Sequence, residues 1–243
     1  MKTIFISGTC RATTVVGDGR GLVNPIHSQQ TNNLPSKNFL TNLFTVKQHI
    51  QFMKFLNKEI ELPDEIQLIK FSFLRTPLLP GENHTVPQRI EIIREQLPKC
   101  DIFLFEICSL KNFKRDLYPM RKDIALDECL NEDEKQPYMK DSFDDVYNDI
   151  YTLCSLVPKE SKIILQTHFR MNIITGDDST TIESREIIYN AVKKYCEENP
   201  LVRHFDPSLL LKDNRDFVLD NAHFQIPKLH NVFYYLYDNF IKE

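Results

Sequence analysis

A cysteine near the start of the chain and an aspartate–histidine pair near its end are the residues most suited to catalysis. Cys10 follows an apolar run that ends in Gly8, and Asp220 and His223 have the spacing D-x-x-H. A histidine can take the proton of a thiol, while an aspartate fixes its tautomer and stabilises the imidazolium. These residue types suit nucleophilic catalysis, with a thiol at Cys10 and a carboxylate–imidazole pair at Asp220 and His223.

Each of these residues also has a simpler interpretation. A free cysteine at the end of a strand is often only a small buried hydrophobe. The D-x-x-H spacing arises by chance in many chains, and His223 alone would more often serve as a structural hydrogen-bonding group. The catalytic hypothesis therefore depends on where the predicted elements place the two segments.

The hydrophobic pattern predicts a single α/β domain over residues 1–243, with three layers and a doubly wound, flavodoxin-like sheet. The run at 101–107 (DIFLFEI) is continuous and apolar apart from its ends, as is typical of a strand buried on both faces. A surface insertion is expected at about 111–140, and a polar loop at 9–35. The five mostly parallel strands are expected at 3–7, 65–74, 101–107, 162–166 and 202–205, and helices at 36–59, 85–97, 122–130, 141–156, 182–198 and 227–241.

Ligands of such sheets bind at the carboxyl ends of the strands, so the residues that follow each strand are candidates for the site. After the first strand, Gly8 would let the backbone turn sharply where a Cβ would crowd the substrate. After the third strand, Ser109 or Asn112 is a candidate oxyanion donor, together with the backbone N–H of residue 10 or 11.

Two arginines and a histidine at the same edge are candidates for substrate binding. Arg11 and Arg170 could receive a phosphate or carboxylate, and His168 could contact the substrate. The simpler interpretation is that the arginines are solvated and that His168 satisfies backbone groups of its loop.

The first and last blocks resemble those of the SGNH (GDSL-like) hydrolase superfamily. Gly8-Thr9-Cys10 stands where that family has G-D-S after its first strand, and Asp220 and His223 match its closing D-x-x-H. A cysteine at the serine position is similar to the GSCFA family and to polysaccharide-biosynthesis acetyltransferases that open with G-N-C-Q. Asn24-Pro25 is also similar to the GSCFA pattern. The middle blocks, a glycine and G-x-N-D, have no counterpart. The resemblance implies an SGNH fold and a Cys-His-Asp triad.

Cysteine in place of serine changes the expected acyl donor. A thiolate leaves a tetrahedral adduct more readily than an alkoxide, so an adduct with an oxygen ester tends to revert, whereas exchange with a thioester is nearly balanced. The sequence therefore favours acyl transfer, with acetyl as the expected group, to a carbohydrate hydroxyl or amine. Acetyl-CoA is the expected co-substrate, and no permanently bound cofactor is expected. The alternatives are a carbohydrate or small-molecule esterase with the same triad, and a non-catalytic carbohydrate- or partner-binding module.

Composition narrows the class of partner. A net charge of -4 and a pI near 6.0 disfavour a general nucleic-acid or anionic-membrane binder. No apolar run approaches the roughly 18 residues of a membrane span. The six cysteines lack CxxC spacing, so no metal site is expected and the thiols suit a reducing, cytoplasmic compartment. The expected partner is a small-molecule or carbohydrate substrate.

Overall fold

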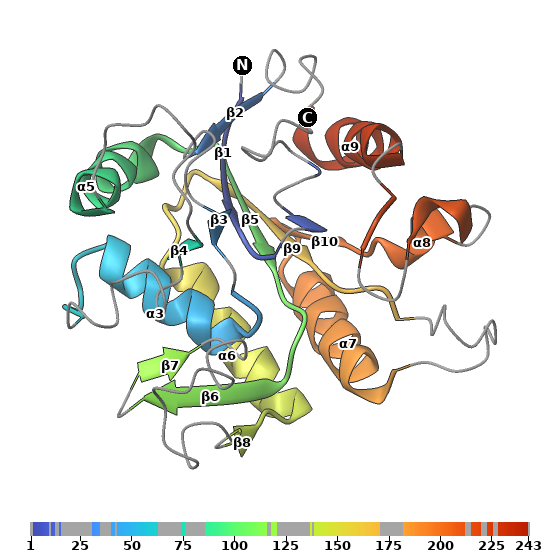
Figure 1. The fold of residues 1–243 in the computed structure, drawn as a ribbon, viewed down its shortest axis with the longest axis horizontal. Helices are drawn as coiled ribbons and strands as arrows, with labels where there is room; N and C mark the ends of the chain where they lie inside the picture. The colour runs from blue at the N-terminus through green and yellow to red at the C-terminus, as the bar shows by residue number, and fades with distance from the viewer. Residues whose placement is uncertain are drawn as a thin grey trace.

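The architecture is a parallel sheet covered by helices on both faces (Figure 1). The structure is a computed structural model. It describes residues 2–9, 11–12, 15, 31–34, 40–41, 43–62, 74–75, 86–115, 118–120, 137, 139–170, 182–211, 215–219, 223–225 and 228–242.

Five strands form the central sheet in the order β10-β9-β5-β1-β2, and every neighbouring pair is parallel. The carboxyl ends of these strands therefore share one edge. The registers pair Ser7 with Phe105 and Glu106 with Gln166, which brings the ends of β1, β5 and β9 to the same level. The strands are β1 Lys2–Ser7, β2 Thr31–Leu34, β5 Ile102–Glu106, β9 Lys162–Gln166 and β10 Val202–Phe205.

Alternate residues of the strands point to opposite faces and build two separate cores. Phe5 and Phe103 belong to the core under α3, α5, α6 and α7, whereas Ile4 and Ile102 belong to the core under α8 and α9. Because β5 is wholly buried, it needs apolar residues on both faces.

The helices are α3 Val46–Leu56, α5 Val86–Gln96, α6 Phe143–Ser155, α7 Glu183–Glu198, α8 Ser208–Leu211 and α9 Leu229–Leu236. Three single turns are also present: η1 Leu97–Lys99, η3 Arg215–Phe217 and the π-helical η5 Tyr237–Ile241.

Two small antiparallel sheets flank this layer structure. One pairs β3 Leu40–Thr41 with β4 Leu74–Arg75. The other joins β7 Tyr118–Met120, β6 Lys111–Arg115 and β8 Met139–Lys140 within the span where an insertion was expected. None of the helices in the described residues combines the length and the apolarity that a membrane span requires.

Most expected elements are confirmed, and two expectations are wrong. The segment 9–35 is not only loop, because β2 lies in it and pairs with β1 at the edge of the sheet. The helix expected from residue 36 starts at Val46, where the side chain of Thr45 and that of Gln48 form a capping box. The expected strand at 65–74 lies outside the described residues except for Leu74, which belongs to β4. The expected helix at 122–130 also lies outside them.

Candidate active site

The carboxylate of Glu106, at the end of β5, organises the turn that follows β1. Its Oε2 accepts hydrogen bonds from the backbone N–H of Thr9 at 2.7 Å and from the Thr9 hydroxyl at 2.6 Å. Its Oε1 accepts one from Nε of Arg11 at 2.5 Å. Glu106 is fully buried, so the residues on both sides of position 10 are held by one desolvated carboxylate.

Position 8 requires glycine because the side chain of the same glutamate lies against it. A Cβ built on Gly8 would lie 2.5 Å from Cβ of Glu106 and 3.0 Å from its Oε2. The sequence predicted crowding of a substrate at this position. The structure shows instead that a side chain would collide with the protein's own buried carboxylate.

A buried histidine on α3, His49, is hydrogen-bonded to the ends of both β1 and β5. Nε2 of His49 lies 2.8 Å from the carbonyl oxygen of Glu106, and Nδ1 lies 2.9 Å from Oγ of Ser7. A carbonyl only accepts, so Nε2 carries the proton and Nδ1 accepts from the Ser7 hydroxyl. Burial lowers the pKa of His49 to about 4, which keeps the ring neutral and suits this arrangement.

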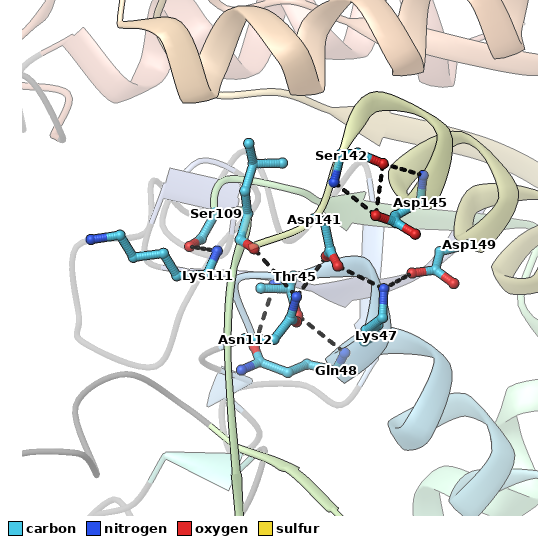
Figure 2. A network of polar contacts seen from close by, with 11 residues as sticks. Thr45, Lys47, Gln48, Ser109, Lys111, Asn112, Asp141, Ser142, Asp145 and Asp149 are labelled. Atoms are coloured by element: carbon cyan, nitrogen blue, oxygen red, sulfur yellow. Dashed lines mark hydrogen bonds and ion pairs between the residues drawn. The ribbon is translucent and has the colours of Figure 1, made fainter. Parts of the chain in front are cut away.

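The segment after β5 is fixed by its backbone. The N–H groups of Cys108 and Ser109 both donate to the carbonyl oxygen of Phe44, at 2.9 and 3.0 Å. Burial, followed by the charge of Glu106, raises the pKa of Cys108 to about 12. Oγ of Ser109 accepts the N–H of Lys111 at 3.1 Å (Figure 2).

Asn112, the other candidate oxyanion donor, belongs to a polar network beside this segment (Figure 2). Its Nδ2 donates to Oδ2 of Asp141 at 2.7 Å and to the carbonyl of Leu110 at 3.3 Å, and the side chain is fully buried. Both hydrogens of the amide are therefore engaged within the protein. Lys47 completes the network with ion pairs to Asp141 at 2.7 Å and Asp149 at 2.6 Å.

His168 follows β9 and is almost completely buried. Its Nδ1 has no hydrogen-bond partner among the described residues. Burial, and then the charges of Arg11 and Arg185, lower the pKa of His168 far below its ordinary value, and the charge of His223 acts in the same direction. Residues from four separate segments therefore share one electrostatic environment at the carboxyl edge of the sheet.

An aromatic contact brings the end of the chain to this edge. The rings of Phe169 and Phe224 meet edge to face with centroids 4.9 Å apart, and each is the direct neighbour of a histidine, His168 or His223. An isolated bridge between Val218 and Phe224 fixes the backbone there. The His223 side chain is exposed.

Arg170 and Arg185 anchor the loop after β9. Arg170 pairs with Asp206 at 3.2 Å and Glu186 at 3.5 Å, and its guanidinium stacks 3.8 Å from the ring centre of Tyr189. Nη1 of Arg185 donates to the carbonyl of Phe169 at 2.9 Å. Arg170 is thus engaged by protein side chains, whereas the charge of Arg185 contributes to the lowered pKa of His168.

Comparison with solved structures bears on the fold. The chain aligns over 100% of its length with 100% of a member of the lipolytic protein G-D-S-L family from Veillonella parvula, at 10% identity and a TM-score of 0.50. The fold is that of a GDSL hydrolase. A family 3 carbohydrate esterase from Clostridium thermocellum (TM-score 0.47, 10% identity, 99% and 97% of the two chains) and an aryl esterase from M. smegmatis (0.45, 10%, 98% and 97%) align less well. No family model and no curated protein matches the chain.

The GDSL fold expected from the SGNH resemblance is therefore confirmed, while the triad itself stays a prediction. Cys10 and Asp220 lie outside the described residues, and only their neighbours Thr9, Arg11 and His223 are placed. Within the described residues no group of three or more histidine, cysteine or acidic side chains is arranged to hold a metal ion.

Three residues of this candidate site were not identified from the sequence. Glu106 ends an otherwise apolar strand, and a charge at that place is the signal that could have marked it. His49 and Arg185 lie on helices, where the sequence offers no sign that they reach the edge of the sheet.

Proposed function

We propose that the chain transfers an acyl group, acetyl in the simplest case, from a thioester such as acetyl-CoA to a carbohydrate hydroxyl or amine. Cys10 is the nucleophile, His223 the general base and acid, and Asp220 the residue that orients His223. The observation that carries the proposal is the contact of Phe169 with Phe224, because it brings the closing segment with His223 to the edge where the turn after β1 ends.

The reaction proceeds in two balanced steps. The Cys10 thiolate, formed by proton transfer to His223, attacks the donor carbonyl, and the donor's thiolate leaves and takes that proton. His223 then removes a proton from the acceptor, the acceptor attacks the acyl-cysteine carbonyl, and the Cys10 thiolate leaves. Hydrogen-bond donors near the developing oxyanion would contribute about 3 kcal/mol each.

Acyl-enzyme formation tests this function. The protein is incubated with acetyl-CoA or with p-nitrophenyl acetate, and the tryptic peptide 3–11, in which Cys10 is the sole cysteine, is weighed. An acetyl adduct from acetyl-CoA that a sugar panel discharges supports the transferase. Cys10→Ala and His223→Ala should abolish the adduct, whereas Cys196→Ala, a matched change on α7, should leave it intact.

An esterase is the second candidate, because the GDSL relative with the TM-score of 0.50 belongs to a lipolytic family. It would use the same three residues, with water as acceptor. Rapid turnover of p-nitrophenyl acetate without a sugar acceptor, together with no adduct from acetyl-CoA, would favour it. No adduct on Cys10 from either donor would contradict both enzymes and favour the binding module.

A further inference from the structure

A buried ion pair flanks the position of the proposed nucleophile. The Arg11 and Glu106 side chains are 6% and 0% exposed, with Nε and Oε1 2.5 Å apart. The same carboxylate binds the N–H and hydroxyl of Thr9. Cys10 is covalently joined to Thr9 and Arg11, so both of its neighbours in the chain are tied to one glutamate.

The charge of Glu106 needs an explanation beyond the hydrogen bonds to Thr9. A glutamine oxygen would accept both of those bonds without the cost of burying an ion. What a glutamine cannot supply is the negative charge opposite Arg11. A buried ion pair is weak evidence for stability, and its presence at the start of the proposed catalytic segment suggests a role in setting local charge.

The nearby thiol of Cys108 shows how the pair acts on a sulfur at this edge. After burial, the charge of Glu106 raises the pKa of Cys108, whereas the charge of Arg11 lowers it. The charge of Arg185 on α7 also lowers the pKa of Cys108. The neutral ring of His49 on α3 is hydrogen-bonded to the backbone carbonyl oxygen of Glu106. The two members of the pair therefore have opposite effects on one thiol, and those effects partly cancel.

We propose that Glu106 and Arg11 form a positioning pair that sets the acidity of the Cys10 thiol. Glu106 holds the turn after β1 and offsets the charge of Arg11, so that neither charge alone determines when the thiolate forms. This inference rests on the proposed function in taking Cys10 as the reacting group. It concerns the ionisation of that group and not the acyl donor.

The test measures the pH dependence of Cys10 alkylation by iodoacetamide, a neutral reagent, between about pH 6 and about pH 10. Trypsin isolates Cys10 in peptide 3–11, or in 3–20 when Arg11 is replaced, so mass spectrometry reports this thiol alone. Glu106→Gln removes the negative charge beside Arg11 and should lower the midpoint by about one pH unit. Arg11→Met leaves Glu106 uncompensated and should raise it by about as much.

The double variant Glu106→Gln/Arg11→Met is the rescue. It removes both charges and should return the midpoint close to that of the unmodified chain. Asp149→Asn and Lys47→Met repeat the two charge changes in the ion pair on α3 and α6 and should leave the midpoint unchanged. If circular dichroism shows that Glu106→Gln does not fold, the direction of the midpoint shift is still measured with Arg11→Met and the double variant.

Loosening of the turn without a charge effect would move both single variants in the same direction, which would overturn the proposal. So would an unchanged midpoint in both, or a folded chain whose Cys10 does not react anywhere in this pH range. Alkylation requires no acyl donor. Opposite shifts without an acyl adduct would therefore retain the pair and reject the proposed function.

Discussion

Phe224 places its ring edge-on against Phe169, with the planes at 75° and the centroids 4.9 Å apart. Both rings are buried in the core under α8 and α9. Through this contact the segment that ends in His223 is fixed to the loop that contains His168. The packing of one aromatic pair thus joins the last part of the site to the sheet.

Phe224→Ala should separate these segments. Loss of a buried ring lowers the free energy of unfolding by about 3 kcal/mol or more, and the acyl-transfer rate should fall although His223 is unchanged. Urea unfolding and the acyl-adduct assay measure the two effects. Ile150→Ala, a cavity in the core under α6, should destabilise without lowering the rate of folded protein. Equal losses of rate in both variants would contradict this role of Phe224.

Gly8→Ala should be destabilising by about 1–3 kcal/mol, because the new methyl group would meet Cβ of Glu106 at 2.5 Å. The collision is with a side chain held by Thr9 and Arg11, which cannot easily move away. Thermal or urea unfolding checks this. Combining Gly8→Ala with Glu106→Gly, which removes that Cβ, should relieve the collision, so the two costs should be less than additive. Full additivity would show that Glu106 is not the obstacle.

His49 should make the protein sensitive to acid. Its pKa is about 4 in the fold, against about 6.5 when unfolded. Protons therefore bind the unfolded chain more tightly, and the free energy of unfolding should fall as the pH drops from about 6.5 to about 4, by about 3 kcal/mol from this group. His49→Gln should reduce the slope of stability against pH in that window. An unchanged slope in urea titrations would contradict a buried neutral His49.

Lys47→Met should cost more stability than Asp149→Asn. Lys47 pairs with Asp141, which is 1% exposed, as well as with the partly exposed Asp149. Removing the lysine leaves a buried carboxylate with the Asn112 amide as its remaining side-chain partner among the described residues, at a cost of about 1–3 kcal/mol. Removing Asp149 leaves the buried pair in place, at a cost below about 1 kcal/mol. Urea unfolding of the two variants tests this order, and the reverse order would refute it.

The four cysteines that the structure describes should be slow to alkylate. Burial raises the pKa of Cys154 to about 11 and that of Cys100, Cys108 and Cys196 to about 12. Little thiolate is present at neutral pH, so iodoacetamide should label them far more slowly than an ordinary cysteine of pKa about 8.5. Peptide mapping over time measures this. Rapid labelling of Cys154 in folded protein would contradict its burial.

The sequence by itself determined the buried elements. The strands β5 and β9 and the helices α6 and α7 lie within two residues of their expected bounds, because a buried strand needs an unbroken apolar run and these helices carry periodic apolar faces. The alternation of strands and helices was also enough to predict the parallel sheet. The GDSL fold follows from that pattern and from the resemblance of the two end blocks.

Only the tertiary structure decided the elements and contacts that depend on distant partners. Thr31–Leu34 contains two asparagines and becomes strand β2 because β1 pairs with it along the backbone. Gly8 is required by Glu106, which lies 98 positions further along the chain, and Asn112 is engaged by Asp141. The hydrophobic periodicity of the sequence indicates which faces of the helices and strands are buried. It does not record which buried polar groups meet, because those pairings are made only when separate segments pack together.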